Sequence, residues 1–128
     1  MARPALLGLA GTATGRRAML ATTVRDGAAM SAADARMLMD TWLTAPGYDA
    51  ANLWMRRGAF DAWDRITAPV TLAWGEKDRL VRPPRRTPPG TTTVTLAGCA
   101  HLPMWDDPGL VMDTIVGGAA RAVAATTA

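Results

Sequence analysis

Residues 68–101 read APVTLAWGEKDRLVRPPRRTPPGTTTVTLAGCAH, and this stretch decides the fold of the chain. Residues 70–74 form a short apolar run between a proline and Gly75, a pattern typical of a strand buried on both faces. Residues 91–97 are rich in β-branched side chains, alternate threonine with apolar residues and end at Gly98, which also predicts a strand. The two runs predict neighbouring parallel strands joined by a long connection.

A side chain of catalytic type follows each predicted strand at the same spacing. Asp78 stands three residues after Gly75, and His101 stands three residues after Gly98. Groups just beyond the carboxyl ends of parallel strands converge on the crevice where open α/β sheets bind their ligands. A carboxylate bonded to one ring nitrogen fixes the histidine tautomer and stabilises the imidazolium formed when the other nitrogen takes a proton. Asp78 and His101 are therefore predicted to be the acid and the histidine of a hydrolytic triad.

At these residues the sequence resembles the C-terminal part of the α/β-hydrolase family, which includes esterases, lipases, epoxide hydrolases, dehalogenases and cofactor-free haloperoxidases. The resemblance rests on the order and spacing of short motifs: Pro69 and Val70, Trp74 and Gly75, the G-x-x-D run ending at Asp78, His101, and Asp107 with Pro108. Ala100 stands where the family's histidine loop usually has a glycine. The resemblance implies an α/β chain with a partial α/β-hydrolase fold. Residues 1–65 would form a helical lid-like segment, and residues 66–128 two parallel strands and a C-terminal helix.

The resemblance also implies an activity, namely hydrolysis of an ester or related bond in a small, largely apolar substrate. His101 would act as general base and acid, and Asp78 would orient it. The family's nucleophile lies on a strained elbow, G-x-S-x-G, which this sequence lacks. Its one serine, Ser31, has no flanking glycines and follows no predicted strand. We therefore expect a remnant of the triad that is inactive alone, through truncation, a split gene or degeneration.

Two helices are expected before the strands. The first begins at Ser31, because a serine cap with Asp34 three residues later satisfies free amides at the helix start, and it stops at Pro46. Its apolar face comprises Ala35, Leu38, Met39, Trp42 and Leu43. The second runs from about residue 50 towards residue 63, with a break at Gly58.

Several large apolar residues are candidates for substrate binding. In a lid, the exposed parts of Met39, Trp42, Trp54 and Met55 would line an acyl or alkyl pocket. Leu102 belongs to an apolar wall beside His101. The alternative interpretation, favoured for any single one of the helix residues, is that they are packing contacts between helices.

The connection between the predicted strands is rich in proline and arginine. Its prolines, which exclude a regular crossover helix, are Pro83, Pro84, Pro88 and Pro89. Its arginines are Arg79, Arg82, Arg85 and Arg86. Such a basic cluster can bind nucleic acid, but no aromatic residues are interleaved with the charges, so a solvated loop is favoured and no nucleic-acid partner is expected.

The end of the chain predicts a closing helix. Asp107 reads as its cap, with Pro108 at the first helical position, where the missing amide costs nothing. One stripe of this helix comprises Met112, Val116, Ala119, Ala120 and Val123. Asp106 is an alternative partner for His101.

Composition limits which other classes of protein this chain can belong to. With 128 residues, 49% hydrophobic content and five tryptophans, the chain is expected to fold as one domain at most. A single cysteine, Cys99, excludes an internal disulfide and is expected to be a buried thiol rather than a nucleophile. One histidine with one cysteine offers no His/Cys zinc site, and neither a metal nor a cofactor is expected. No membrane span or export signal is predicted, which favours a cytoplasmic location.

Two strands alone form a marginal sheet, so the sequence also predicts an association. The exposed sheet edge is expected to pair with a second copy or with a partner chain. A non-catalytic interaction module, or half of a split enzyme that needs a partner chain, is therefore the alternative to a hydrolase.

Overall fold

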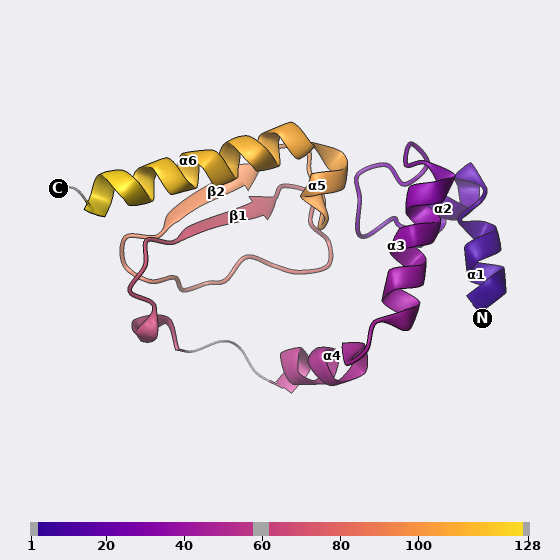
Figure 1. Ribbon diagram of the computed structural model, residues 1–128, viewed down its shortest axis with the longest axis horizontal. Helices are drawn as coiled ribbons and strands as arrows, with labels where there is room; N and C mark the ends of the chain where they lie inside the picture. The colour runs from indigo at the N-terminus through magenta and orange to yellow at the C-terminus, as the bar shows by residue number, and fades with distance from the viewer. Residues whose placement is uncertain (1–2, 58–61, 127–128) are drawn as a thin grey trace. The chain divides into compact units, whose positions relative to one another are not determined.

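The computed structural model describes residues 3–57 and 62–126, which form helices and a two-stranded parallel sheet (Figure 1). The chain divides into two compact units. The first comprises Met1–Ala21 and Asp26–Asp61, and the second comprises Thr22–Arg25 and Ala62–Ala128. The expected boundary lay between residues 65 and 66. The main difference is that the second unit also includes Thr22–Arg25.

The first unit is helical. Its helices are α1 (Arg3–Leu9), α2 (Ala13–Met19), α3 (Ala32–Thr44) and α4 (Tyr48–Arg57). The first three contact one another, and Ala10, Leu20 and Ala35 are buried. Arg3 of α1 forms an ion pair with Asp40 of α3.

The predicted start of α3 is confirmed. The hydroxyl of Ser31 accepts a hydrogen bond from the Asp34 amide at 3.0 Å and donates one to Asp34 Oδ2 at 2.6 Å. The next helix, α4 (Tyr48–Arg57), begins two residues before its predicted start. A separate 3₁₀ turn, η1 (Trp63–Arg65), follows, and the predicted break at Gly58 lies outside the described residues.

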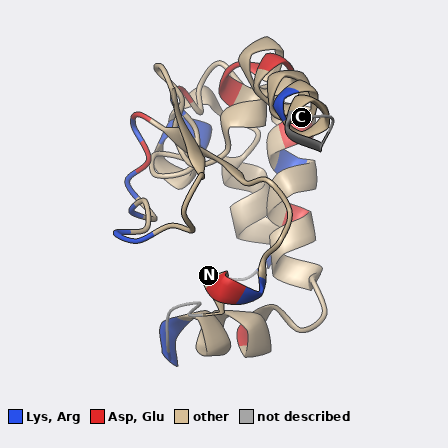
Figure 2. Ribbon diagram, turned by 90° about the vertical axis from the view of Figure 1, so that its left-hand side faces the viewer, with Lys and Arg blue, Asp and Glu red and all other residues tan. Residues whose placement is uncertain are grey.

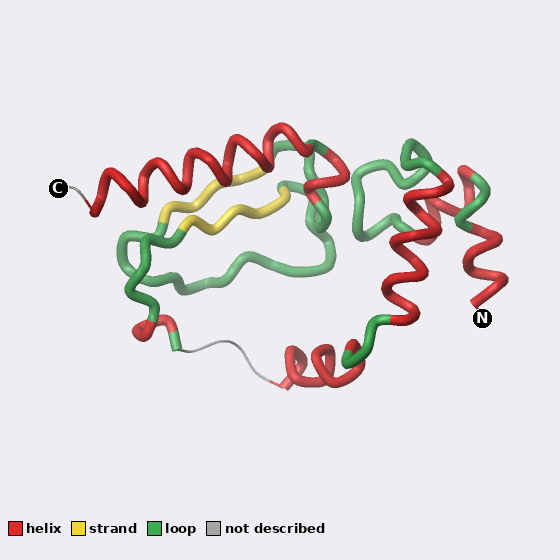
Figure 3. Tube along the Cα trace, in the orientation of Figure 1, coloured by secondary structure: helices red, strands yellow, loops and turns green. Residues whose placement is uncertain are grey.

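The second unit contains the sheet. Strands β1 (Thr71–Gly75) and β2 (Thr92–Leu96) lie parallel, with Thr71 opposite Thr92 and Gly75 opposite Leu96. Both strands lie within one residue of their predicted bounds. The connection between them contains no helix, as its prolines predicted (Figure 3).

Helix α6 (Pro108–Thr126) runs along one face of the sheet, after the short helix α5 (Pro103–Asp106) (Figure 1). Its predicted cap is confirmed, since Asp107 Oδ1 accepts a hydrogen bond from the Leu110 amide at 2.8 Å. A Cβ on Gly118 would lie 3.3 Å from Thr71 Oγ1, so this glycine allows a close approach of helix and strand.

The apolar stripe expected on α6 is not its packed side. Met112, Val116 and Val123 are exposed. Between residues 108 and 124, the half-buried residues of the helix are Leu110, Val111, Thr114, Gly117, Gly118 and Ala122. Leu110 and Val111 pack at the start of the helix and small residues pack further along it, whereas Met112, Val116 and Val123 are exposed.

Candidate active site

Asp78 and His101 lie in tight loops that follow the two strands. After β1, the Asp78 amide donates to the Gly75 carbonyl at 3.1 Å, which closes a turn. After β2, the Cys99 amide donates to the Leu96 carbonyl at 3.2 Å, and Gly98 in this turn has a φ of 72°. A φ in this region favours glycine because a Cβ there crowds the following carbonyl.

The two loops are bonded to each other. The Lys77 amide donates to the Cys99 carbonyl at 2.8 Å, and the Gly98 amide donates to Glu76 Oε2 at 2.8 Å. The loop that carries the acid is thus held in a fixed register with the loop that carries the histidine.

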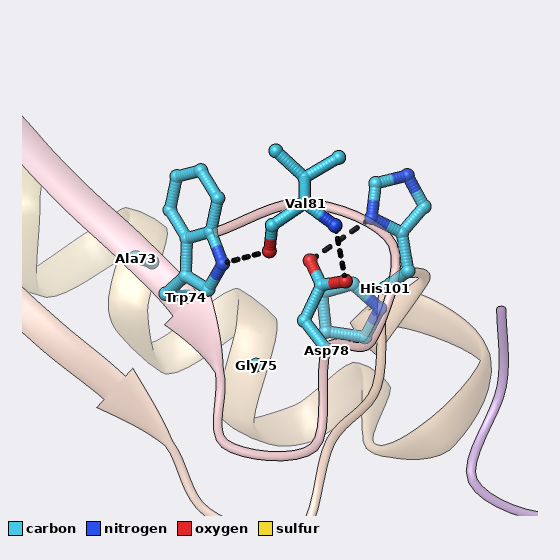
Figure 4. Close-up of a pocket in the computed structure, with 7 residues that line it drawn as sticks. Ala73, Trp74, Gly75, Asp78, Val81 and His101 are labelled. Carbon is cyan, nitrogen blue, oxygen red and sulfur yellow. Dashed lines mark hydrogen bonds and ion pairs between the residues drawn. The ribbon is translucent and has the colours of Figure 1, made fainter. Parts of the chain in front are cut away.

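The structure places the two predicted catalytic side chains in direct contact. Asp78 Oδ2 lies 3.0 Å from His101 Nδ1 (Figure 4). The other oxygen, Oδ1, accepts hydrogen bonds from the amides of Leu80 at 2.8 Å and Val81 at 3.0 Å. The Asp78 side chain is 6% exposed and the His101 side chain 34% exposed, so the carboxylate is inside and the imidazole reaches the surface.

The environment of Asp78 favours its charged form. Burial alone raises the pKa of this carboxyl, but the hydrogen bonds from His101, Val81 and Leu80, together with the charge of the histidine, outweigh burial and lower the pKa below its ordinary value. The carboxylate is therefore a fixed hydrogen-bond acceptor at neutral pH.

A fixed acceptor at Nδ1 determines what the rest of the imidazole can do. The proton of a neutral His101 is assigned to Nδ1, because an ionised carboxylate only accepts hydrogen bonds. Nε2 is then a lone-pair acceptor, and in Figure 4 it points away from Asp78. No hydrogen bond joins it to the part of the chain that the structure describes.

A shallow pocket of about 180 Å³ adjoins this pair. It is lined by Ala73, Trp74, Gly75, Asp78, Val81, His101 and Pro103. The indole Nε1 of Trp74 donates to the Val81 carbonyl at 3.0 Å, which fixes one wall (Figure 4). Apart from the acid and the histidine the walls are apolar, so the pocket suits a small apolar group.

The predicted substrate-binding residues are not among those that line this pocket. Trp42 is half-buried on α3, while Trp54 and Met55 are exposed on α4, and all of them belong to the first unit. Leu102 follows His101, but its neighbour Pro103 forms the wall. A role in substrate binding for these residues stays a prediction.

Two features of the site were missed from the sequence. Residues 22–25 pack against the histidine loop, where the Leu102 amide donates to the Thr23 carbonyl at 2.7 Å. Asp106, considered as a partner of His101, is bonded instead to the backbone amides of Arg25 and Ala100. A backbone contact leaves no signature in a single sequence, so only the polarity of Asp106 could have indicated it.

The remaining chemical groups near the site are a thiol and a basic loop. Cys99 is fully buried, and burial, followed by the charges of Asp106 and Asp107, raises the pKa of its thiol despite the opposing charge of Arg25. The connection between the strands carries five basic side chains, all of them exposed: Lys77, Arg79, Arg82, Arg85 and Arg86. Lysine and arginine are blue in Figure 2. Across the described residues, no cluster of three His, Cys, Asp or Glu could hold a metal ion.

Comparison with known proteins finds no match: no family model, no curated protein and no solved structure matches the chain. As for membranes, none of the helices within residues 3–57 and 62–126 is long and apolar enough to cross one.

Proposed function

We propose that this chain supplies the acid and the histidine of an α/β-hydrolase-type site, and that a polypeptide segment outside these 128 residues supplies the nucleophile. The observation that carries the proposal is the 3.0 Å contact of Asp78 Oδ2 with His101 Nδ1, just beyond the ends of two parallel strands. Ligands of open α/β sheets bind at this end.

In this role His101 moves protons through Nε2. A nucleophilic hydroxyl gives its proton to Nε2 as its oxygen bonds to the carbonyl carbon of the ester, and Asp78 stabilises the imidazolium. The imidazolium then returns the proton to the leaving alkoxide. In the second half, water gives its proton to Nε2, adds to the acyl carbon and releases the acid. The proton finally returns to the nucleophile's oxygen.

The pocket limits the substrate. A volume of about 180 Å³ with walls from Trp74, Val81 and Pro103 suits a short acyl or alkyl group. The substrate class we propose is therefore a small, largely apolar ester.

Ser31 is a poor candidate for the nucleophile. Its hydroxyl caps α3, where it bonds twice to Asp34. The hydroxyl proton is donated to Asp34 Oδ2, and the hydroxyl oxygen accepts from the Asp34 amide, so both are used by the cap and no imidazole takes part. For this reason the nucleophile is assigned to another polypeptide segment.

Hydrolysis of activated and ordinary esters tests the proposal. Imidazole itself attacks p-nitrophenyl acetate, so the chain should release p-nitrophenol faster than the His101→Gln variant does. Ethyl butyrate should stay intact with the chain alone and be hydrolysed after addition of a partner that carries a G-x-S-x-G elbow. Equal p-nitrophenol release by the wild type and His101→Gln would contradict an available Nε2. Turnover of ethyl butyrate by the chain alone would contradict an external nucleophile.

A second candidate function is that of an interaction module, and one edge of β1 favours it, because no other strand of the described residues pairs with that edge. The Val70 carbonyl accepts from the Thr92 amide and the Glu76 amide donates to the Leu96 carbonyl, both at 3.0 Å. Alternate residues of a strand direct their backbone groups to opposite sides, so the amides and carbonyls of Thr71 and Ala73 point to the open edge.

A groove of about 330 Å³ runs beside this edge. It is lined by Pro69, Thr71, Ala73, Thr114, Ile115, Gly118, Ala119 and Ala122. An extended segment of the nucleophile-bearing partner would add a strand to β1 and place alternate side chains in the groove.

Proline substitutions at the two sheet edges test this docking mode. Ala73→Pro removes an amide from the free edge of β1 and should abolish capture of the partner. Thr95→Pro removes an amide from the opposite free edge, that of β2, and is the matched control. Equal loss of capture in both variants would contradict docking at β1. If the wild type forms dimers as its concentration rises, and Ala73→Pro abolishes them, the edge of β1 binds a second copy of this chain instead.

A further inference from the structure

One carboxylate beside the site has no part in the proposed chemistry, yet it holds the backbone on which His101 stands. Asp106 Oδ2 accepts a hydrogen bond from the Ala100 amide at 2.6 Å, and Asp106 Oδ1 accepts one from the Arg25 amide at 2.7 Å. Ala100 directly precedes His101. The side chain of Asp106 thus joins the histidine loop to residues 22–25.

The backbone on the other side of His101 is held by the same early segment. The Leu102 amide donates to the Thr23 carbonyl at 2.7 Å, and Arg25 Nη2 donates to the carbonyl of Asp106 at 3.2 Å. The two amides that flank His101 in the sequence are therefore both bonded, one through Asp106 and one directly.

The side of this junction that carries Ala100 is buried, whereas Arg25 is exposed, so the bond to the Ala100 amide matters most. Thr23 is 6% exposed, Val24 3% and Ala100 4%. A buried amide that loses its acceptor must stay unpaired, because water cannot replace the lost oxygen. Loss of the Asp106 carboxylate is then relieved most simply by a shift of the backbone at Ala100 and His101.

We propose that Asp106 is a positioning residue for His101. Its carboxylate accepts hydrogen bonds from the amides of Ala100 and Arg25. These bonds hold the histidine loop in the position in which Nδ1 of His101 faces Asp78 and Nε2 is available to a substrate. The consequence for catalysis rests on the proposed function. The positioning itself does not, since it is a property of this chain alone.

The sole histidine of the chain makes this testable, because every imidazole signal in an NMR spectrum comes from His101. Two-bond ¹H–¹⁵N correlation spectra report which ring nitrogen carries the proton. The wild type should show the Nδ1–H tautomer with slow exchange of its ring proton. Asp106→Asn retains the size of the side chain but has one acceptor oxygen, and should shift the ring towards the Nε2–H tautomer and speed exchange several-fold.

Asp107→Asn is the matched control, because it removes the same charge at the next residue. Asp107 caps α6 and bonds to neither amide of the junction, and asparagine can make the same cap, so the His101 signals should keep the wild-type pattern. An unchanged tautomer in Asp106→Asn, or an equal shift in both variants, would overturn the proposal.

Arg25→Ala keeps the test decisive if Asp106→Asn does not fold. It removes only the guanidinium bond to the Asp106 carbonyl and should shift the tautomer in the same direction by a smaller amount. Wild-type His101 signals in Arg25→Ala, with Asp106→Asn unfolded, would mean that Asp106 serves folding alone, which overturns the proposal. Failure of ester hydrolysis would refute the proposed function and leave the tautomer result unaffected.

Discussion

Gly75 and Ala100 lie in close backbone contact, since a Cβ on Gly75 would overlap the carbonyl oxygen of Ala100. Gly75 ends β1, and Ala100 precedes the predicted catalytic histidine. The spacing between the two loops, and with it the distance from Asp78 to His101, depends on the missing side chain.

Gly75→Ala should therefore displace the histidine loop. We expect a loss of about 2 kcal/mol or more in the free energy of unfolding, in the range of overpacked sites, together with a change in the His101 ring signals. Gly8→Ala in α1 is the control, because no atom lies within 4 Å of its added Cβ. Urea unfolding followed by tryptophan fluorescence measures the difference. A stable Gly75→Ala variant with wild-type ring signals would contradict the close contact.

Asp78→Asn should change the pH dependence of stability. The pKa of Asp78 in the folded chain lies below its ordinary value of 3.8, so its carboxylate stabilises the fold above that value and this contribution is lost as the pH falls through the folded pKa. At pH 7 we expect the variant to lose about 1–3 kcal/mol, the usual effect of breaking hydrogen bonds to a buried charged group. The difference between the unfolding midpoints of the two proteins should shrink as the pH falls below 3.8. A constant difference would contradict the prediction.

Trp74→Phe should loosen the pocket wall without unfolding the sheet. The indole bond to the Val81 carbonyl is lost, which costs about 1 kcal/mol. Val81 also donates to Asp78, so amide exchange at Leu80 and Val81 should accelerate. Hydrogen exchange followed by NMR measures this, with the amide of Leu110 in α6 as the internal reference. Unchanged exchange at Val81 would show that the indole bond does not hold the loop.

Cys99 should react poorly in the folded chain. Alkylation requires the thiolate, and both burial and the raised pKa of the thiol disfavour it. Iodoacetamide should label the native chain far more slowly than the chain in urea at the same pH. Cys99→Ser should cost about 1–3 kcal/mol because it buries a hydroxyl without a partner, whereas Cys99→Ala should cost less. Equal labelling of native and unfolded chains would contradict burial.

The parts of the fold with a strong local signal were predictable. The bounds of both strands were predictable to within one residue, because each strand has a local pattern. The first is an apolar run between a proline and a glycine, and the second is a threonine-rich run that ends at a glycine. Ser31 and Asp107 predicted the starts of their helices, because a capping side chain lies close in sequence to the amides that it accepts hydrogen bonds from. Asp78 and His101 were paired by equal spacing after parallel strands, which brings side chains to one end of a sheet.

Features that depend on distant backbone contacts were not predictable. Nothing in residues 22–25 indicates that they belong with the histidine loop, because Thr23 and Arg25 reach it mainly through a carbonyl and an amide. Asp106 and Asp107 look alike as neighbours, and only the geometry separates the one that holds the loop from the one that caps α6. The stripe on α6 was misleading because Gly118 lets the helix approach Thr71 of β1 through a different side.

The assignment of Thr22–Arg25 to the second unit limits how this protein can be dissected. No single cut of the gene separates the units, because a fragment that begins at residue 62 lacks the oxygen of Thr23 and the amide of Arg25.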